Sequence, residues 1–326
     1  MPIVPCAAAT NPAFLLSPAL WNSQRHTASA NLSYVSIIER LGPWPARACW
    51  VVLAVVAQSP VADALDGRSR AVQVVTIAGL ATAWTAGLVA LLIPRTTSLT
   101  VVRLIVPAGL AVVGAAAALG TESNWVDVIA ATTAGLAISA VLAPWFTQTW
   151  VDGSSYGPEV RLPLQTPPLL AAVLVPLTLA SVWAGVTVGP LLLASGQWVA
   201  GIVASAVGAA LAFAGVRSIH QLSRRWVVMV PAGMVLHDPL TLPEAHMVPR
   251  KMIISLHPAA AGTDAFDLTA GASGLALQID FDEPLDLLVR AKGRSTETLA
   301  RSAVMFTPAR PRQLLDCARD NRINVG

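Results

Sequence analysis

Cysteine and histidine side chains are the first groups of this chain to weigh for metal binding or redox chemistry. The three cysteines are Cys6, Cys49 and Cys317. They lie far apart and none belongs to a CxxC pair, which argues against a zinc site and a disulfide framework. Four histidines lie in the last third: His220, His237, His246 and His257. No two share the short spacing of metal-ligand pairs, so we expect strand-edge and turn histidines.

Carboxylates gather in the segment "DFDEPLD", at Asp280, Asp282, Glu283 and Asp286. Carboxylate oxygens suit calcium or magnesium, so a weak cation site is one interpretation. The segment lacks the glycine and the length of an EF-hand loop. A solvated acidic turn is favoured, and no metal or cofactor is expected.

Serines and glycines gather in the polar loop 147–168. Its centre reads Asp152, Gly153, Ser154, Ser155, Tyr156 and Gly157. These residues are typical of turns, because glycine permits positive φ and Asp and Ser bond nearby backbone. Neither the GxSxG nucleophile motif nor the GxxxxGK[ST] phosphate loop is present. We expect a structured loop that packs on the C-terminal domain, and we name it the candidate functional loop.

Composition explains why catalytic motifs are scarce. Of 326 residues, 55% are hydrophobic and 12% are charged, with a mean hydropathy of +0.63. Soluble domains carry about 25% charged residues. Of 18 acidic residues, 11 follow residue 225. The first two-thirds therefore resembles a polytopic membrane protein, and the last third resembles a water-soluble domain. The tail has no basic stripe, so no nucleic-acid partner is expected.

The N-terminal segment 1–43 has no Lys or Arg before Arg25, and prolines break its apolar runs. A signal peptide needs a basic region ahead of its apolar core. We expect a poorly ordered or amphipathic leader, and an over-extended gene start is the alternative. Heavy Ala and Val use, with arginine in place of lysine, suggests a GC-rich bacterial genome.

Six windows are long and apolar enough to cross about 30 Å of hydrocarbon. They cover 46–64, 71–93, 99–119, 125–146, 169–188 and 198–219. The first is the weakest, because Gln58, Pro60 and Asp63 crowd its far end. Nine arginines fall on one side of this arrangement and only Arg68 and Arg70 on the other. Since cytoplasmic loops are rich in Lys and Arg, both termini are predicted in the cytoplasm.

Within the spans, polar residues stay near helix ends. Arg103 lies near the inner end of its span, where a long side chain can reach the headgroups. Gln58, Asp63, Gln73 and Asp127 form an outer polar group, either an entrance or helix ends wetted by interface water. Ionisable residues kept for ion coupling usually lie deeper, so a proton pump is not favoured.

Small residues recur along the sixth span, at Gly201, Ser205, Gly208, Ala212 and Gly215. Gly185 and Gly189 form a GxxxG pair in the fifth span. Small residues let helices approach closely. The pattern indicates packing inside the bundle, with a homodimer interface as the alternative.

The tail opens with "RRWVVMVPAGMVLHDP". Two β-type runs flank Pro231-Ala232-Gly233, which predicts a hairpin. Further strands are predicted at 250–257, 265–270, 274–281, 285–291 and 301–307. The segment "RQLLDCARDNRI" then predicts a helix. The expected fold is a six-helix membrane bundle, residues 44–223, followed by a small antiparallel β barrel or sandwich with a C-terminal helix, residues 224–326.

The segments "RRWVVMVPAGMVLHDP", "VPRKMIISL" and "VMFTPARPRQLLDCARDN" resemble those of pleckstrin-homology-like domains in bacterial membrane proteins. The resemblance implies a cytoplasmic, membrane-apposed binding or assembly module without catalysis. The first hairpin loop lacks the basic cluster of headgroup-binding members. The group expected at the lipid interface is Arg224, Arg225, Trp226, Arg250 and Lys251.

The function expected from these features is assembly or regulation of membrane proteins through the cytoplasmic β-rich domain, in a bacterial plasma (inner) membrane. The alternative is a transporter or channel-like protein for a neutral or apolar solute, with the tail as its regulator. An enzyme is not expected, because no nucleophile–base or metal set stands out. Expected partners are the lipid bilayer, other membrane proteins or a second copy of the chain.

Overall fold

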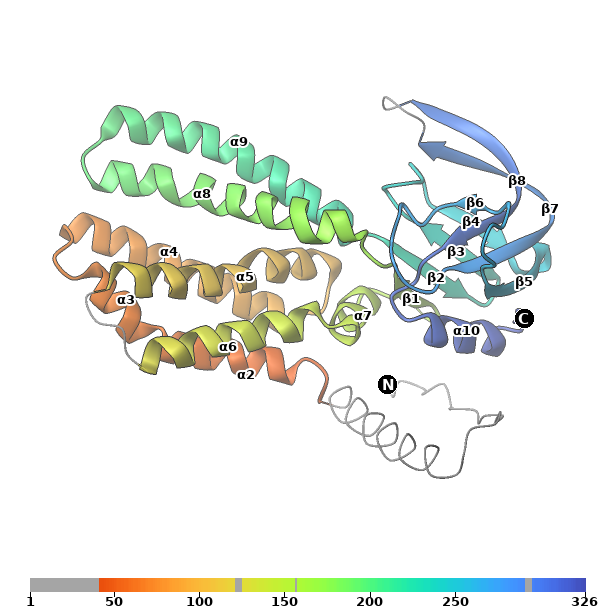
Figure 1. Ribbon diagram of the computed structural model, residues 1–326, viewed down its shortest axis with the longest axis horizontal. Helices are drawn as coiled ribbons and strands as arrows, with labels where there is room; N and C mark the ends of the chain where they lie inside the picture. Colours follow the sequence, from red (N-terminus) through yellow and green to blue (C-terminus); the bar gives the residue numbers. More distant parts are fainter. Residues whose placement is uncertain (1–40, 121–124, 156, 291–294) are drawn as a thin grey trace.

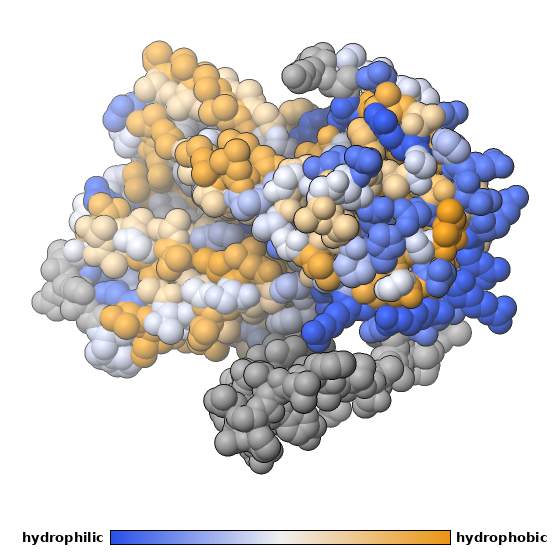
Figure 2. Space-filling view, turned by 45° about the vertical axis from the view of Figure 1, so that its right-hand side comes forward, coloured by the Kyte–Doolittle hydropathy of each residue, from blue (hydrophilic) through white to orange (hydrophobic). Residues whose placement is uncertain are grey.

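The computed structural model describes residues 41–120, 125–155, 157–290 and 295–326. A bundle of long helices, the helical bundle, adjoins a compact domain of strands, the sheet domain (Figure 1). Figure 2 shows hydrophobic residues over much of the helical bundle and mostly hydrophilic residues over the sheet domain. Most of the leader predicted at 1–43 lies outside the described residues.

Six helical segments of the described chain are long and apolar enough to span a membrane. They are Trp44–Leu65, Arg70–Leu92, Thr96–Leu119, Trp125–Leu142, Leu170–Ala194 and Trp198–Leu222. The prediction of six apolar spans is confirmed, including the weak first one. The fourth span is four residues shorter than predicted, and the fifth runs six residues further.

Prolines explain two breaks in these helices. The first span consists of α2 (Trp44–Val56) and α3 (Gln58–Leu65), which meet at Ala57. Pro60 has no N–H to bond the carbonyl of Val56, so the helix is interrupted one turn before it. Likewise α6 (Trp125–Leu142) ends before Pro144, and α7 (Pro144–Asp152) starts in a new direction. Ala143 is extended, as expected for a residue before proline.

The other spans are α4 (Arg70–Leu92), α5 (Thr96–Leu119), α8 (Val175–Ala194) and α9 (Trp198–Leu222). A short π-helix, η1 (Leu170–Leu174), begins the fifth span, and Val175 N–H bonds the carbonyl of Leu170. Pro176 cannot donate the next hydrogen bond, which accounts for the local widening at this point. The helices α8 and α9 form a hairpin beside the other four spans (Figure 1).

The small residues of α9 face α8. A Cβ atom on Gly185 of α8 would lie 2.6 Å from the carbonyl oxygen of Gly208. A Cβ on Gly189 would lie 2.7 Å from the backbone nitrogen of Ser205, and Gly201 and Gly215 contact Leu193 and Val182 in the same way. The seam is therefore occupied by packing within the hairpin, which speaks against its use as a homodimer interface.

The first sheet contains β1 (Val160–Pro163), β2 (Trp226–Val230), β3 (Gly233–His237) and β4 (His246–Pro249), in that order. All neighbours are antiparallel. The predicted hairpin is present as β2 and β3. Two strands were not predicted: β4, and β1, which comes from the loop between the fourth and fifth spans.

The second sheet has the order β5-β7-β8-β6. Its strands are β5 (Ile253–Pro258), β6 (Phe266–Asp267), β7 (Leu277–Arg290) and β8 (Thr296–Phe306). Of the expected barrel or sandwich, the closed barrel is wrong, because both sheets are open within the described residues. The expected antiparallel pairing has one exception, since β6 pairs with β8 in parallel. The strands predicted at 274–281 and 285–291 form one strand, β7. Glu283-Pro284 produces a register shift rather than a break.

The core of the sheet domain lies between the two sheets and α10 (Pro311–Asp320), the predicted C-terminal helix. Val227 and Met229 of β2, Ile279 of β7 and Leu314 of α10 are buried in it. Residues preceding β5 form the short η2 helix, Arg250–Met252, where a strand was predicted. Two sheets and one helix thus share a single core.

Strand β2 is covered on both faces. Val227 and Met229 point into the core of the sheet domain, whereas Trp226 and Val228 belong to the apolar cluster of the helical bundle. Phe146 and Trp150 of α7, which are stacked at 3.9 Å, lie in that cluster. Side chains alternate between the faces of a strand, so the continuous run "WVVMV" indicates a strand buried on both sides.

Arg225 holds the junction of α9 and β2. Its Nε and Nη2 each donate to one carboxylate oxygen of Asp238 at 2.7 Å, and its Nη1 donates to the carbonyl of Gln165 at 2.8 Å. Arg225 and Asp238 are both 3% exposed. The expectation that Arg225 faces lipid is therefore wrong, because its guanidinium is used inside the protein.

We expect Asp238→Ala to lower the free energy of unfolding by about 3–5 kcal/mol, since it leaves a buried guanidinium unpaired. The exposed pair Arg319–Asp316 supplies the control, and Asp316→Ala should change stability by less than about 1 kcal/mol. Chemical denaturation of the purified protein measures both. The double variant Arg225→Met/Asp238→Leu should recover most of the loss. A double variant as unstable as Asp238→Ala would contradict this account of the pair.

Candidate functional site: an apolar groove in the helical bundle

A groove of about 620 Å³ lies between α2, α3, α4 and α5 in the helical bundle. It is lined by apolar side chains, and Trp183 of α8 closes one side. Figure 1 places α3 at the end of the bundle remote from the sheet domain, and the groove lies along it. Its volume is within the range of about 300–1,000 Å³ typical of small-molecule sites.

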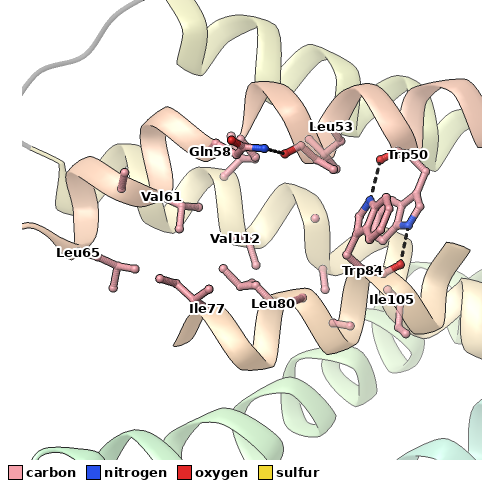
Figure 3. Close-up of a pocket in the computed structure, with 18 of the residues that line it drawn as sticks. Trp50, Leu53, Gln58, Val61, Leu65, Ile77, Leu80, Trp84, Ile105 and Val112 are labelled. Carbon is pink, nitrogen blue, oxygen red and sulfur yellow. Dashed lines mark hydrogen bonds between the residues drawn. The ribbon is translucent and has the colours of Figure 1, made fainter. Parts of the chain in front are cut away.

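Two tryptophans form the end of the groove nearest the sheet domain. The indole N–H of Trp50 donates to the carbonyl oxygen of Trp84 at 3.1 Å, and that of Trp84 donates to the carbonyl oxygen of Trp50 at 3.2 Å (Figure 3). Trp183 donates to the carbonyl of Leu104 at 2.8 Å. The three N–H groups are thus paired within the protein, and the rings present apolar faces to the groove.

Glycines bring the helices close enough for this packing. A Cβ atom on Gly87 of α4 would lie 2.8 Å from the Trp50 ring. A Cβ on Gly109 of α5 would lie 2.9 Å from the side chain of Leu53. Side chains at these positions would force α2 away from α4 and α5. The shape of this end of the groove therefore depends on the two glycines.

Among the described residues that line the groove, Gln58 alone has a polar side chain apart from the tryptophans. Its Nε2 donates to the carbonyl of Ala54 at 3.1 Å (Figure 3). Within the described chain, no donor bonds its Oε1, which leaves one acceptor on an otherwise apolar wall. Such a wall suits an uncharged ligand that carries a single donor, such as a hydroxyl group.

The rest of the outer polar group serves the helix ends. Gln73 donates to the carbonyl of Leu65, the last residue of α3, and to the carbonyl of Arg68, three residues later. Asp127 is 8% exposed at the start of α6. A Cβ atom on Gly120 would collide with the carboxylate of Asp63. Only Gln58 of this group lines the groove.

The residues expected at the lipid interface do not form one surface. Trp226 is buried, and its ring lies 5.0 Å from that of His237 and 5.8 Å from the Arg161 guanidinium. Its expected place at a lipid interface is therefore wrong. Arg250 and Lys251 are exposed next to the turn between β2 and β3, at the opposite end of β2. Arg224 is half-buried and lies 3.5 Å from the His237 ring nitrogen.

The candidate functional loop joins α7 to β1. Asp152 accepts hydrogen bonds from the hydroxyl of Ser155 at 2.9 Å and from the backbone N–H of Arg161 at 3.0 Å. Gly153 packs on Pro94, and Gly157 has a φ of +65°. Ser154 is half-buried beside them, and Tyr156 lies outside the described residues. These contacts explain how the loop enters the first sheet, and they indicate a structural role.

The histidines lie apart, and no cluster of three metal-ligating side chains occurs in the described ranges. The pKa of His257 is raised by its hydrogen bonds to the Pro258 carbonyl and, at 2.7 Å, to Asp280. Burial lowers the pKa of His246 and, together with Arg224, that of His237. Ser255 donates its hydroxyl hydrogen to the same Asp280 oxygen that His257 bonds, so this hydrogen is directed to the carboxylate and not to the imidazole.

The acidic turn is built into β7. Partial burial raises the pKa of Asp280, but hydrogen bonds from Gln278, His257 and Ser255 outweigh it and lower the pKa overall. Asp282, Glu283 and Asp286 are exposed. Asp280 is thus committed to protein partners, and its neighbours face solvent.

Comparison of the chain with protein-family models, curated proteins and solved structures finds no match. The resemblance to pleckstrin-homology-like domains therefore stays a prediction. The sequence also did not predict the groove. The local sequence signal for the groove is the pair Gly87 and Gly109. These glycines lie against the side chains of Trp50 and Leu53, where a larger residue would clash.

Proposed function

We propose that this membrane protein binds an uncharged, largely apolar molecule from the bilayer in the groove between α2 and α5. The observation that carries the proposal is the lining: apolar side chains and one amide around about 620 Å³. A charged ligand would lose its hydration with no counter-charge to replace it. A lipid-like molecule with one hydroxyl group loses little hydration free energy on entering the groove, because Gln58 Oε1 can accept the hydrogen bond of that hydroxyl.

This proposal develops the alternative of a transporter or channel-like protein for a neutral or apolar solute. The sheet domain, which packs against the bundle, is then the regulatory domain of this protein. A pleckstrin-homology-like fold would fit a regulatory domain. A role in assembly or regulation of other membrane proteins is the second candidate. Its support is the exposed surface of the α8–α9 hairpin, which another membrane protein could contact. Only 6% of the span that contains α8 is buried within the described chain.

A photoactivatable fatty alcohol tests ligand binding in the groove. We expect it to label α2–α5 of the full-length protein in nanodiscs, as mapped by peptide mass spectrometry. Ala81→Trp, which fills the groove, should remove most of this labelling. Ala78→Trp, on the same helix but outside the groove, should leave it unchanged. Gln58→Leu should weaken labelling by the alcohol but not by the matching hydrocarbon.

Equal labelling of α9 and of the groove helices, unaffected by Ala81→Trp, would refute ligand binding. Gentle purification then separates the two candidates. A small apolar molecule retained by the wild type but not by Ala81→Trp supports the groove. A protein retained equally by both supports assembly.

We also propose that the sheet domain lies in the cytoplasm of a bacterial cell and that the membrane is the plasma membrane. Support comes from the arginines: most of those near the spans flank the end that carries the sheet domain. We expect a cysteine at Ser195, between α8 and α9, to react with an impermeant thiol reagent in intact cells. The parent chain is the control. Labelling of Ser195→Cys only after lysis would reverse the orientation.

A further inference from the structure

Arg103 places a guanidinium among the spanning helices. It lies about two turns into α5, or about 10 Å along the axis from Thr96. A charge in this region is costly unless a counter-charge or several polar groups surround it. The groups around the guanidinium therefore indicate the role of this side chain.

The contacts of Arg103 within the described chain are neutral. Its Nη1 donates to the hydroxyl oxygen of Ser223 at 3.0 Å, and its Nη2 donates to the hydroxyl oxygen of Thr147 at 3.2 Å. Within the described ranges Arg103 forms no ion pair, in contrast to Arg161, Arg225 and Arg319. A guanidinium has five N–H donors. Two are used, and no carboxylate of the described residues balances the charge.

The groups around Arg103 are polar or basic. Ser223 already donates its hydrogen to the carbonyl of Ile219 at 3.1 Å, so toward Arg103 it is an acceptor. One turn earlier on each helix, the Thr100 hydroxyl lies 2.9 Å from Nδ1 of His220. Arg224 follows Ser223 directly. Three elements, α5, α7 and α9, thus bring cationic and hydroxyl groups to one place.

The guanidinium lies level with the end of the last spanning helix. Ser223 caps the end of α9, the last spanning helix. Arg103 therefore reaches from inside the span to the level at which α9 leaves it, which is the usual behaviour of a long cationic side chain. At that depth a bilayer presents phosphate groups.

We propose that Arg103, with the Thr147 hydroxyl beside it, binds a phosphate-type oxyanion, supplied by an anionic lipid of the leaflet on the sheet-domain side. Phosphate oxygens accept parallel N–H bonds from the planar guanidinium, and Thr147 supplies a further donor. The bound anion replaces the missing counter-charge. The site is distinct from the apolar groove, which lies toward the other end of the bundle.

Native mass spectrometry of the full-length protein tests this site, with phosphatidylglycerol, phosphatidylcholine of the same chains, and inorganic phosphate as probes. We expect the wild type to retain phosphatidylglycerol over phosphatidylcholine at physiological ionic strength. Arg103→Gln should weaken phosphatidylglycerol binding about tenfold or more, as expected for lost hydrogen bonds to a charged group. Arg103→Lys keeps the charge but loses the planar pair of N–H donors, so its phosphatidylglycerol binding should lie between that of the wild type and that of Arg103→Gln.

Arg217→Gln is the matched control, because Arg217 is exposed near the same end of α9. It should change retention far less than Arg103→Gln. Inorganic phosphate could also bind the wild type, displace the lipid and depend on Arg103 in the same way. That result would support the oxyanion site but assign it to free phosphate. Equal retention of both lipids by the wild type overturns the proposal whether or not the variants fold. Equal losses in Arg103→Gln and Arg217→Gln overturn it as well.

Discussion

Burial of the first sheet on both faces is the constraint on which the rest of this structure depends. One face of β2 packs into the core of the sheet domain, and the other packs on the apolar ends of the helices. Each apolar side chain removed from water contributes about 1.5–3 kcal/mol. Neither half can therefore leave the other without exposing Trp226 and Val228. We therefore expect the helical bundle and the sheet domain to unfold together.

The connections of the chain reinforce that constraint. Strand β1 is supplied by the loop between the fourth and fifth spans, whereas β2 continues directly from the sixth. Antiparallel pairing of the two strands therefore joins segments that lie on either side of the α8–α9 hairpin. Arg225 adds a buried link, since it bonds Gln165 just after β1 and Asp238 just after β3. The chain thus passes between the helices and the first sheet three times, from α7 to β1, from β1 toward α8 and from α9 to β2, which limits movement of the sheet domain against the bundle.

This arrangement gives the two proposed sites different surroundings. The apolar groove lies toward the free end of the bundle, where its helices are held together by indole N–H bonds and by close contacts at glycines. The guanidinium of Arg103 lies at the end that carries the first sheet, between α5, α7 and α9. An uncharged ligand suits the first environment, and an anion suits the second.

The six spans and the hairpin of β2 and β3 could be predicted from the sequence, because length, hydropathy and turn residues are local properties. Strand β1 could not, since "VRLP" is short and lies inside a polar loop, and only its partner β2 makes it a strand. Arg225 follows Arg224 at the end of a span and so resembles a lipid anchor. Its carboxylate partner is thirteen residues away and becomes adjacent only through the hairpin. The groove depends on contacts between Trp50, Gly87 and Trp84, which no single window of sequence contains.

The unity of bundle and sheet domain can be measured with the native thiols. Cys49 lies half-buried in α2, and Cys317 is buried in the core of the sheet domain. Two variants, each keeping one of these thiols as its only cysteine, are heated with a maleimide reagent, with and without Val228→Asp. We predict that both thiols become reactive at the same temperature and that Val228→Asp lowers both midpoints equally. Reaction of Cys317 well below the midpoint of Cys49, or a shift of Cys317 alone, would contradict the account.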